Sequence, residues 1–142
     1  GYLEQLLLMQ GLNNKMAKGV AREILDELRR CCEEPFFKWI TGNDFQWSAS
    51  ELGIESMAEK NVITSGVIDR VVFDGKKYWI VDYKTHQPGT NETKGDFIER
   101  MKGKFKPQLV EYRRLLASAK GISDHHIHTV IYLTHIPTWI EV

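Results

Sequence analysis

The sequence predicts an α/β domain with a central mixed β-sheet flanked by helices, and three observations lead to this fold class. Segments with helical periodicity precede and follow three strand-forming segments, and a last strand-forming segment closes the pattern. The length of 142 residues is typical of one domain. The composition, 42% hydrophobic and 27% charged, is typical of a folded globular chain. We therefore expect one domain over residues 1–142 with the element order α-β-β-β-α-β.

The N-terminal third is predicted to be helical. Residues 2–9 form a short helix, and Asn13 or Asn14 can cap a second helix that Pro35 ends. Within the second helix, apolar side chains at a spacing of four predict one buried stripe, which consists of Met16, Val20, Ile24 and Leu28. The apolar cluster that follows, residues 36–40, is expected to pack under the sheet.

Three predicted strands come next, over residues 45–51, 62–73 and 77–84, and Asp74-Gly75 marks a hairpin between the last two. A long helix is predicted over residues 96–119. Because Pro107 lies inside it, the helix is either kinked there or begins near residue 106. A last strand is expected over residues 127–134.

Composition and charge exclude several classes of protein. No apolar run approaches the ~20 residues of a membrane-spanning helix, so a transmembrane protein is excluded. The adjacent Cys31 and Cys32 suit neither a disulfide scaffold nor a zinc framework, and the histidines near residue 126 lack partners at metal-ligand spacing. The net charge is zero, but residues 94–120 carry eight basic and three acidic side chains. This segment either binds a polyanion such as nucleic acid or forms a solvated helix face.

Three charged residues, Asp69, Asp82 and Lys84, interrupt otherwise apolar predicted strands. A buried carboxylate is costly unless it is paired or bound to a metal ion. A two-residue turn would pair Phe73 with Lys76 and make the two acids diagonal neighbours, whereas a four-residue turn would place them directly opposite. A three-residue turn would put Asp69 on the other face. Both even-numbered turns bring the two carboxylates and the lysine together.

Such a cluster indicates one of two kinds of structure. Two adjacent carboxylates repel each other unless a cation lies between them, and their hard oxygen atoms suit Mg²⁺ or Mn²⁺. A divalent ion beside a lysine can activate water and neutralise charge on a phosphate, which predicts metal-assisted hydrolysis of a phosphate ester. The alternative is a surface hairpin with an Asp–Lys ion pair.

Three segments in order, GVIDR, WIVDYKT and KPQLVEY, resemble the motifs of the PD-(D/E)XK nuclease superfamily. The resemblance is closer to the RecB-type nuclease domain at the C-terminus of UvrD-like helicases and in the exonuclease V beta subunit, and it spans about residues 12–133. It implies a restriction-endonuclease-like core. It also implies that residues 1–142 are a RecB-like nuclease domain from a longer helicase–nuclease chain.

The resemblance also implies roles for particular residues. Asp69 would be the first catalytic acid, Asp82 the acid of the D-x-K motif and Lys84 its lysine. Asp69, Asp82 and the backbone carbonyl of Tyr83 would hold Mg²⁺ or Mn²⁺. Two further residues, Gln108 and Tyr112, match the Gln-x-x-x-Tyr helix of the family and complete the catalytic set.

Two acidic positions are open in this comparison. Many RecB-type domains carry Gly-x-x-x-His on the first core helix, but here Glu23 stands four residues after Gly19. Glu23 is therefore either a metal ligand in place of the histidine or a solvent-exposed charge. Glu51 resembles an acidic position at the end of the first strand, where it would be a metal ligand or, as we favour, a strand-end charge.

The function that the resemblance implies is that of a divalent-metal-dependent DNA nuclease, an exonuclease V-like hydrolase in DNA repair and recombination. Its substrate would be single-stranded DNA or duplex ends. No Gly-x-x-x-x-Gly-Lys loop is present, so a helicase motor would lie elsewhere in the chain or in a partner protein. The expected location is the bacterial cytoplasm, at the nucleoid. One alternative is a DNA-binding or scaffolding module whose catalysis has lapsed, and a weaker one is a metal-dependent phosphatase.

Overall fold

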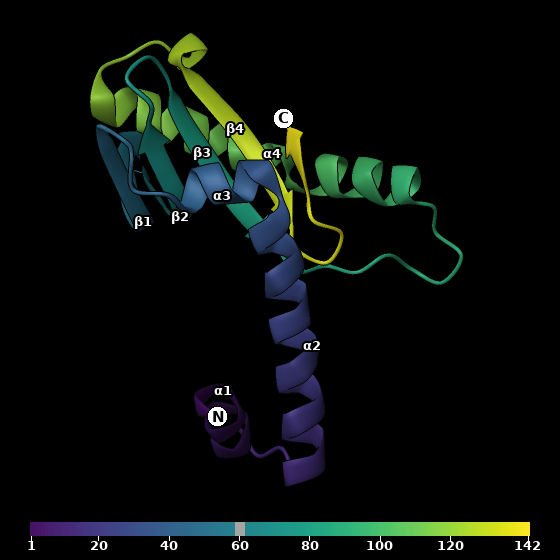
Figure 1. Cartoon of the computed structure of the whole chain (residues 1–142). Coiled ribbons are helices and arrows are strands. Elements are labelled where there is room, and N and C mark those ends of the chain that lie inside the picture. The colour runs from purple at the N-terminus through teal and green to yellow at the C-terminus, as the bar shows by residue number, and fades with distance from the viewer. Residues whose placement is uncertain (59–61) are drawn as a thin grey trace. The chain divides into compact units, whose positions relative to one another are not determined.

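The computed structural model describes residues 1–58 and 62–142, which fall into two compact units. The first unit, Gly1–Trp39, is helical, and the second, Ile40–Val142, contains the sheet (Figure 1). No helix among the described residues is both long enough and apolar enough to cross a membrane. The α/β class and the mixed sheet are as the sequence predicts.

The first unit contains α1 (Tyr2–Met9) and α2 (Asn14–Glu33), and α3 (Pro35–Thr41) crosses from it into the second unit. The side chain of Asn13 accepts a hydrogen bond of 3.0 Å from the Met16 amide and so caps α2, as predicted. Cys31 and Cys32 are free thiols. The apolar cluster at residues 36–40 is part of α3, which the sequence pattern did not indicate as a helix.

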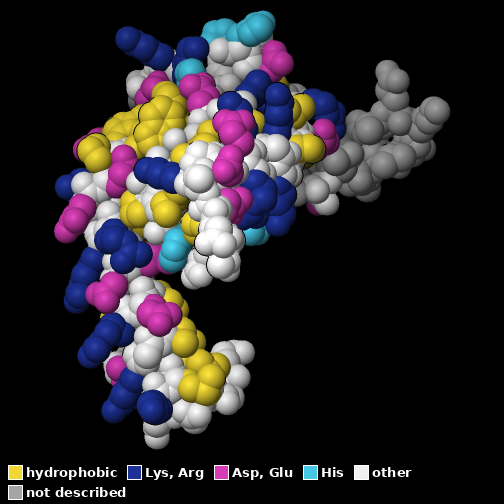
Figure 2. All heavy atoms as spheres, turned by 90° about the vertical axis from the view of Figure 1, so that its right-hand side faces the viewer, with side chains coloured by type: hydrophobic (Ala, Val, Ile, Leu, Met, Phe, Trp, Pro, Cys, Tyr) yellow, Lys and Arg dark blue, Asp and Glu magenta, His cyan; other side chains and the backbone are white. Residues whose placement is uncertain are grey.

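The predicted buried stripe of α2 is wrong. Met16 is 56% exposed and Leu28 45% exposed, whereas the small residues Ala17 and Ala21 are buried. Because α2 packs mainly on the short α1 within this unit, only a narrow face of small side chains is covered. In Figure 2 the helical unit accordingly shows apolar side chains on one side and Lys and Arg on the other.

The second unit is built on a five-stranded sheet with the order β1-β2-β3-β4-β5. Its strands are β1 (Trp47–Ala58), β2 (Val62–Phe73), β3 (Tyr78–Lys84), β4 (Ile127–Leu133) and β5 (Thr138–Glu141). Only β3 and β4 are parallel, and the other neighbours are antiparallel. The parallel pair requires a crossover, which α4 (Lys94–Lys120) supplies after β3. A short 3-10 helix, Asp124–His126, leads into β4.

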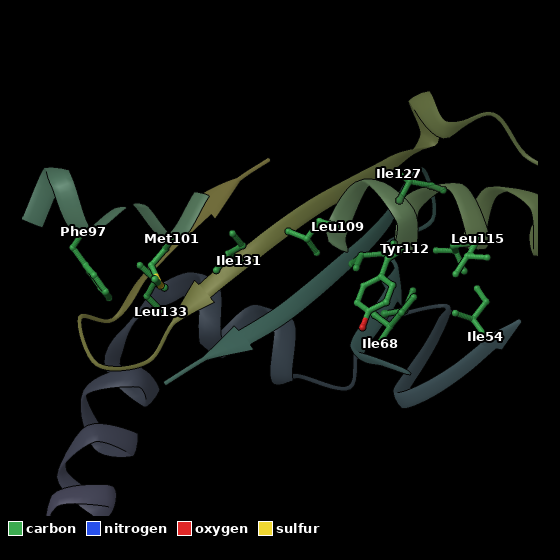
Figure 3. Close-up of a cluster of buried hydrophobic side chains, with 13 residues drawn as sticks. Ile54, Ile68, Phe97, Met101, Leu109, Tyr112, Leu115, Ile127, Ile131 and Leu133 are labelled. Carbon is green, nitrogen blue, oxygen red and sulfur yellow. The ribbon is translucent and has the colours of Figure 1, made fainter. Parts of the chain in front are cut away.

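Helix α4 covers one face of the sheet and supplies much of the hydrophobic core. Figure 3 shows Met101, Leu109 and Leu115 pointing from the helix toward side chains of the strands, among them Ile68 and Ile131. Thr93 caps the first turn of α4 through the Asp96 amide, and Gly121 ends the helix with a left-handed φ of 64°. The helix begins at Lys94 and continues through Pro107, so the alternative start near residue 106 is wrong.

A close approach between β2 and α4 fixes the identity of Gly66. A Cβ atom at this position would lie 2.7 Å from Cε1 of Tyr112. The Tyr112 ring cannot move away freely, because its hydroxyl donates a hydrogen bond of 2.8 Å to the Val67 carbonyl. The ring therefore lies across β2 at a place where the strand has no side chain.

We expect Gly66→Ala to lower the free energy of unfolding by about 1–3 kcal/mol, because it overpacks this contact. The matched control is Gly53→Ala on the neighbouring strand, where a Cβ would meet nothing within 4 Å. That substitution should be neutral or slightly stabilising, since alanine is favoured over glycine inside a strand. Urea denaturation of both variants tests this, and equal destabilisation would contradict it.

Candidate active site

The hairpin between β2 and β3 decides how the predicted acids meet. Phe73 pairs with Tyr78, so four residues separate the strands, and the register is that of the four-residue turn rather than of the two-residue turn. Asp74 stabilises this turn by accepting hydrogen bonds from the amides of Lys76 and Lys77, each 2.8 Å long. Continued along the strands, the register sets Asp69 opposite Asp82.

Strand β2 changes the face that it presents to the core at Asp69 and Arg70. In a regular strand, side chains three residues apart point to opposite faces, yet Ile68 and Val71 both belong to the core under α4. The neighbouring β1 is irregular at the same level, where Glu51 has a φ of 51° and does not pair with Asp69. Asp69 therefore sits where the regular ladder is interrupted.

The Asp69 carboxylate replaces a missing backbone acceptor. The β2–β3 ladder ends at the pair Arg70–Val81. One residue beyond the position opposite Asp69, the amide of Tyr83 donates a hydrogen bond of 2.9 Å to Oδ2 of Asp69. This bond ties the carboxylate to β3 and fixes it beside Asp82. Arg70 holds the break from the other side by donating to the carbonyls of Ile40 and Gly42.

Asp82 is a buried carboxylate whose nearest cation is Lys84. Asp82 is 2% exposed, and the Lys84 ammonium lies 2.6 Å from its Oδ2. The two groups are in contact without good hydrogen-bond alignment, and Oδ2 has no properly directed donor. A buried oxygen of this kind is costly, so it is a position where a bound cation would be stabilised.

Burial is the main reason that the pKa of Asp82 is raised above its ordinary value, and the nearby charge of Asp69 adds to this effect. The Lys84 ammonium opposes both by favouring the ionised form. The electrostatic interaction between Asp69 and Asp82 also indicates that the two carboxylates lie close to each other. Any further cation between them would favour ionisation of both.

Lys84 is held on three sides, unlike a flexible surface lysine. Besides its contact with Asp82, its ammonium donates to Oε1 of Gln108 at 3.3 Å and lies 4.2 Å from the centre of the Phe105 ring. Its side chain is only 16% exposed. These contacts fix the position of the charge at the C-terminal end of β3.

Gln108 and Tyr112 connect Lys84 to the fold of the sheet, as their spacing of four predicts. The side-chain amide of Gln108 donates to the Tyr112 hydroxyl at 3.0 Å, and this hydroxyl in turn donates to the Val67 carbonyl. Tyr112 is buried in the core, whereas Gln108 is exposed. The hydrogen-bonded chain therefore runs from the core to the lysine.

The described part of this site offers oxygen atoms to a metal ion. Among the described residues, no group of three or more His, Cys, Asp or Glu side chains comes together. The candidate donors are the carboxylates of Asp69 and Asp82 and the backbone carbonyl of Tyr83. Two carboxylates and a carbonyl suit Mg²⁺ or Mn²⁺, which keep several water ligands when they bind proteins. The residues present, including the unsatisfied Oδ2 of Asp82, therefore fit such an ion.

The two open acidic positions differ in their surroundings. Glu51 lies inside β1 rather than at its end, because the strand runs on to Ala58, so the predicted strand-end charge is wrong. It is exposed and stands opposite Asp69 at the interruption of the ladder. Glu23 lies on α2 in the first unit and is also exposed.

The basic segment on α4 is divided by intramolecular contacts. Arg100 pairs with Glu92, Arg114 pairs with Glu111, and Arg113 donates to the Thr129 hydroxyl and, at 2.7 Å, to the Val142 carbonyl. On the face seen in Figure 2, Lys and Arg side chains are interspersed with acidic ones. The predicted basic segment is therefore not one continuous cationic surface.

Sequence comparisons point to one family. A profile of the PD-(D/E)XK nuclease superfamily matches residues 2–135. The large subunit of an ATP-dependent helicase/nuclease from Natranaerobius thermophilus is 34% identical over 92 residues, a stretch that is 63% of this chain. The same stretch is 7% of the length of that protein.

Glu92 anchors the loop between Lys84 and α4, and this anchor depends on pH. Its carboxylate accepts hydrogen bonds of 2.7 Å from both Arg100 Nε and the Gly89 amide. These bonds, with that from Arg100 the larger cause, lower the pKa of Glu92 to about 2. Because the folded-state pKa is lower than the unfolded value of 4.5, the stabilisation is present above pH 4.5. It is lost as the pH falls from there toward 2.

We therefore expect Glu92→Gln to destabilise the chain at neutral pH and to match the parent as the pH approaches 2. Chemical denaturation at several pH values measures the difference. Glu111→Gln is the matched control, because Glu111 forms only an exposed pair with Arg114 within one helix, and such pairs contribute little. A pH-independent difference for Glu92→Gln would contradict the role of its ionised form.

Proposed function

Because the chain belongs to the PD-(D/E)XK nuclease superfamily, we propose that it hydrolyses DNA phosphodiester bonds with Asp69, Asp82 and Lys84 at the centre of the reaction. Its relation to the nuclease domain of a helicase/nuclease follows from the comparisons alone. The reaction, its metal ion and the roles of individual residues are our proposal.

One observation carries the proposal above all others. Two carboxylates from neighbouring strands and one immobilised ammonium meet at the end of β3, and Asp82 keeps a buried oxygen without a directed hydrogen bond. A purely structural ion pair would not need the second carboxylate, whose charge makes the ionised state of Asp82 less favourable. A cation-binding site does need it.

In this proposal Asp69, Asp82 and the Tyr83 carbonyl hold Mg²⁺ or Mn²⁺. Such an ion, when bound, supplies an activated water molecule and neutralises charge that develops on the phosphate. The chain positions the donors beforehand, because the Tyr83 amide fixes Asp69 and burial fixes Asp82.

Lys84 would act on the reacting groups directly. Its ammonium has three donor hydrogens, and it lies beside Asp82 with Gln108 as a second partner. There it can orient the attacking water and stabilise the negative charge that grows as the water oxygen bonds to phosphorus and the ester bond breaks. Gln108 and Tyr112 would position the lysine, since they link it to the Val67 carbonyl.

The biological setting is proposed from the relative. We propose that the domain works as an exonuclease on single-stranded DNA or duplex ends, together with a helicase motor in the same chain or in a partner, in DNA repair and recombination. The relative is named as part of an ATP-dependent helicase/nuclease, which supports a helicase-associated nuclease. A bacterial cytoplasmic location at the nucleoid is consistent with this setting.

We expect Asp82→Ala to abolish cleavage of single-stranded DNA in Mg²⁺, with a loss of at least about a hundredfold, while the far-ultraviolet circular dichroism spectrum stays unchanged. Asp82→Asn keeps the shape of the side chain and should lose activity to a similar degree. The measurement is the initial rate of release of labelled nucleotides from a single-stranded oligonucleotide.

The control for these variants is Asp124→Asn. Asp124 is exposed and lies before β4, at the end of the parallel pair away from Lys84. This substitution should leave cleavage within about twofold of the parent, because it touches no residue of the site. Cleavage by Asp82→Ala at the parental rate would show that the catalytic assignment is wrong.

A nuclease fold whose catalysis has lapsed is the second candidate, and the lack of a third acidic or histidine ligand in the described residues favours it. Calorimetric titration with Mn²⁺ separates the two candidates. An active site should bind Mn²⁺ with saturation in the parent and lose this binding in Asp69→Asn and Asp82→Asn, whereas a scaffold should bind none. Glu51→Gln in the same titration would show whether this exposed acid takes part.

A further inference from the structure

A second group of basic side chains surrounds Phe105, next to the proposed catalytic centre. The ammonium groups of Lys84 and Lys104 lie 4.2 and 5.1 Å from the centre of its ring. The imidazole of His86 meets the same ring edge-on, with the ring centres 5.3 Å apart. Three nitrogen-bearing side chains from β3, the following loop and α4 therefore gather around one aromatic ring.

His86 and Lys104 are in direct contact, although both can carry a positive charge. Nε2 of His86 lies 3.0 Å from Nζ of Lys104. Burial lowers the pKa of His86, and the charges of Lys104, Lys84 and Arg100 lower it further. Arg100 is neutralised by its own partner Glu92, so the excess charge facing His86 comes from the two lysines. An anion at this position would relieve the repulsion among these groups.

Resting on the proposed nuclease function, we propose that His86 and Lys104 form a subsite that binds a phosphodiester group adjacent to the one that is cut. Both nitrogens can donate to phosphate oxygens, and Lys104 provides a localised positive charge. The Phe105 ring supports both side chains and holds them beside Lys84. These two residues would therefore position the DNA strand and would not take part in the chemical step.

Lys104 is distinguished from the other bases of α4 by its place on the helix. It stands one turn before Gln108, so both side chains project toward Lys84 from the same side of α4. Lys106 is exposed as well, but it lies two residues along and therefore points about 200° away around the helix. The arginines at 100, 113 and 114 have intramolecular partners. Lys104 and Lys106 are thus a matched pair for testing the subsite.

The first test measures binding of a short single-stranded oligodeoxynucleotide to the 142-residue chain in EDTA, where metal-dependent cleavage cannot occur. Lys104→Ala should raise the Kd about tenfold, as expected for the loss of one charge-assisted contact. It should also lower the slope of log Kd against log salt concentration by about 1. Lys106→Ala should change the Kd less than about twofold. Equal effects of the two substitutions would overturn the subsite in favour of general attraction between DNA and the helix.

A second test follows His86 itself by nuclear magnetic resonance. Addition of the oligonucleotide should raise the pKa of His86, since a phosphate stabilises the imidazolium form, and Lys104→Ala should reduce this rise. His126, which is exposed and lies before β4, serves as the control histidine. An unchanged pKa of His86 at saturating oligonucleotide would overturn the proposal, because the imidazole would then not contact phosphate.

Steady-state kinetics separates a failure of this subsite from a failure of the proposed function. With Mg²⁺, Lys104→Ala and His86→Gln should raise KM about tenfold and leave kcat within about twofold, whereas Asp82→Asn should lose cleavage and still bind the oligonucleotide. If Asp82→Asn loses cleavage but Lys104→Ala keeps the parental KM, the nuclease assignment stands and the subsite is wrong. If the parent does not cleave DNA, the nuclease proposal fails, and the binding tests alone decide whether His86 and Lys104 contact phosphate.

Discussion

The burial of the Asp82 carboxylate is the constraint on which the rest of the site depends. A carboxylate in the interior must be compensated, and Lys84 provides only part of that compensation because the contact is poorly directed. The lysine is in turn held by Gln108 and by the face of Phe105, both on α4. The requirement for a partner charge at one position of β3 is therefore met by residues that the fold brings from a distant helix.

Helix α4 couples the hydrophobic core to this polar site. Its inward side chains, such as Met101 and Leu109, fill the space over the sheet, while Phe105 and Gln108 reach the end of β3 from the same helix. Tyr112 belongs to both sets, since its ring is buried and its hydroxyl joins Gln108 to β2. Packing of the core and placement of the lysine are thus consequences of one helix position, and rigid supporting elements of this kind favour a preorganised site.

Much of the site could be predicted from the sequence because it depends on short-range geometry. The spacing of two between Asp82 and Lys84 puts them on one face of a strand, and the spacing of four between Gln108 and Tyr112 puts them on one side of a helix. The elements missed were short or close to other elements: α3 follows α2 after a single residue, and β5 has four residues. The stripe on α2 was misassigned because periodicity identifies a helix face but not the surface that covers it.

The sequence by itself determined the α/β class, the order of the main elements and the identity of the charged residues on the strands, since these follow from local periodicity and residue chemistry. Only the tertiary structure decided which hairpin register applies, that β2 changes face at Asp69, and that His86 and Lys104 meet beside Phe105. The physical reason is that these features depend on contacts between segments far apart in the chain. His86 and Lys104 are 18 positions apart, and no local pattern specifies that they meet.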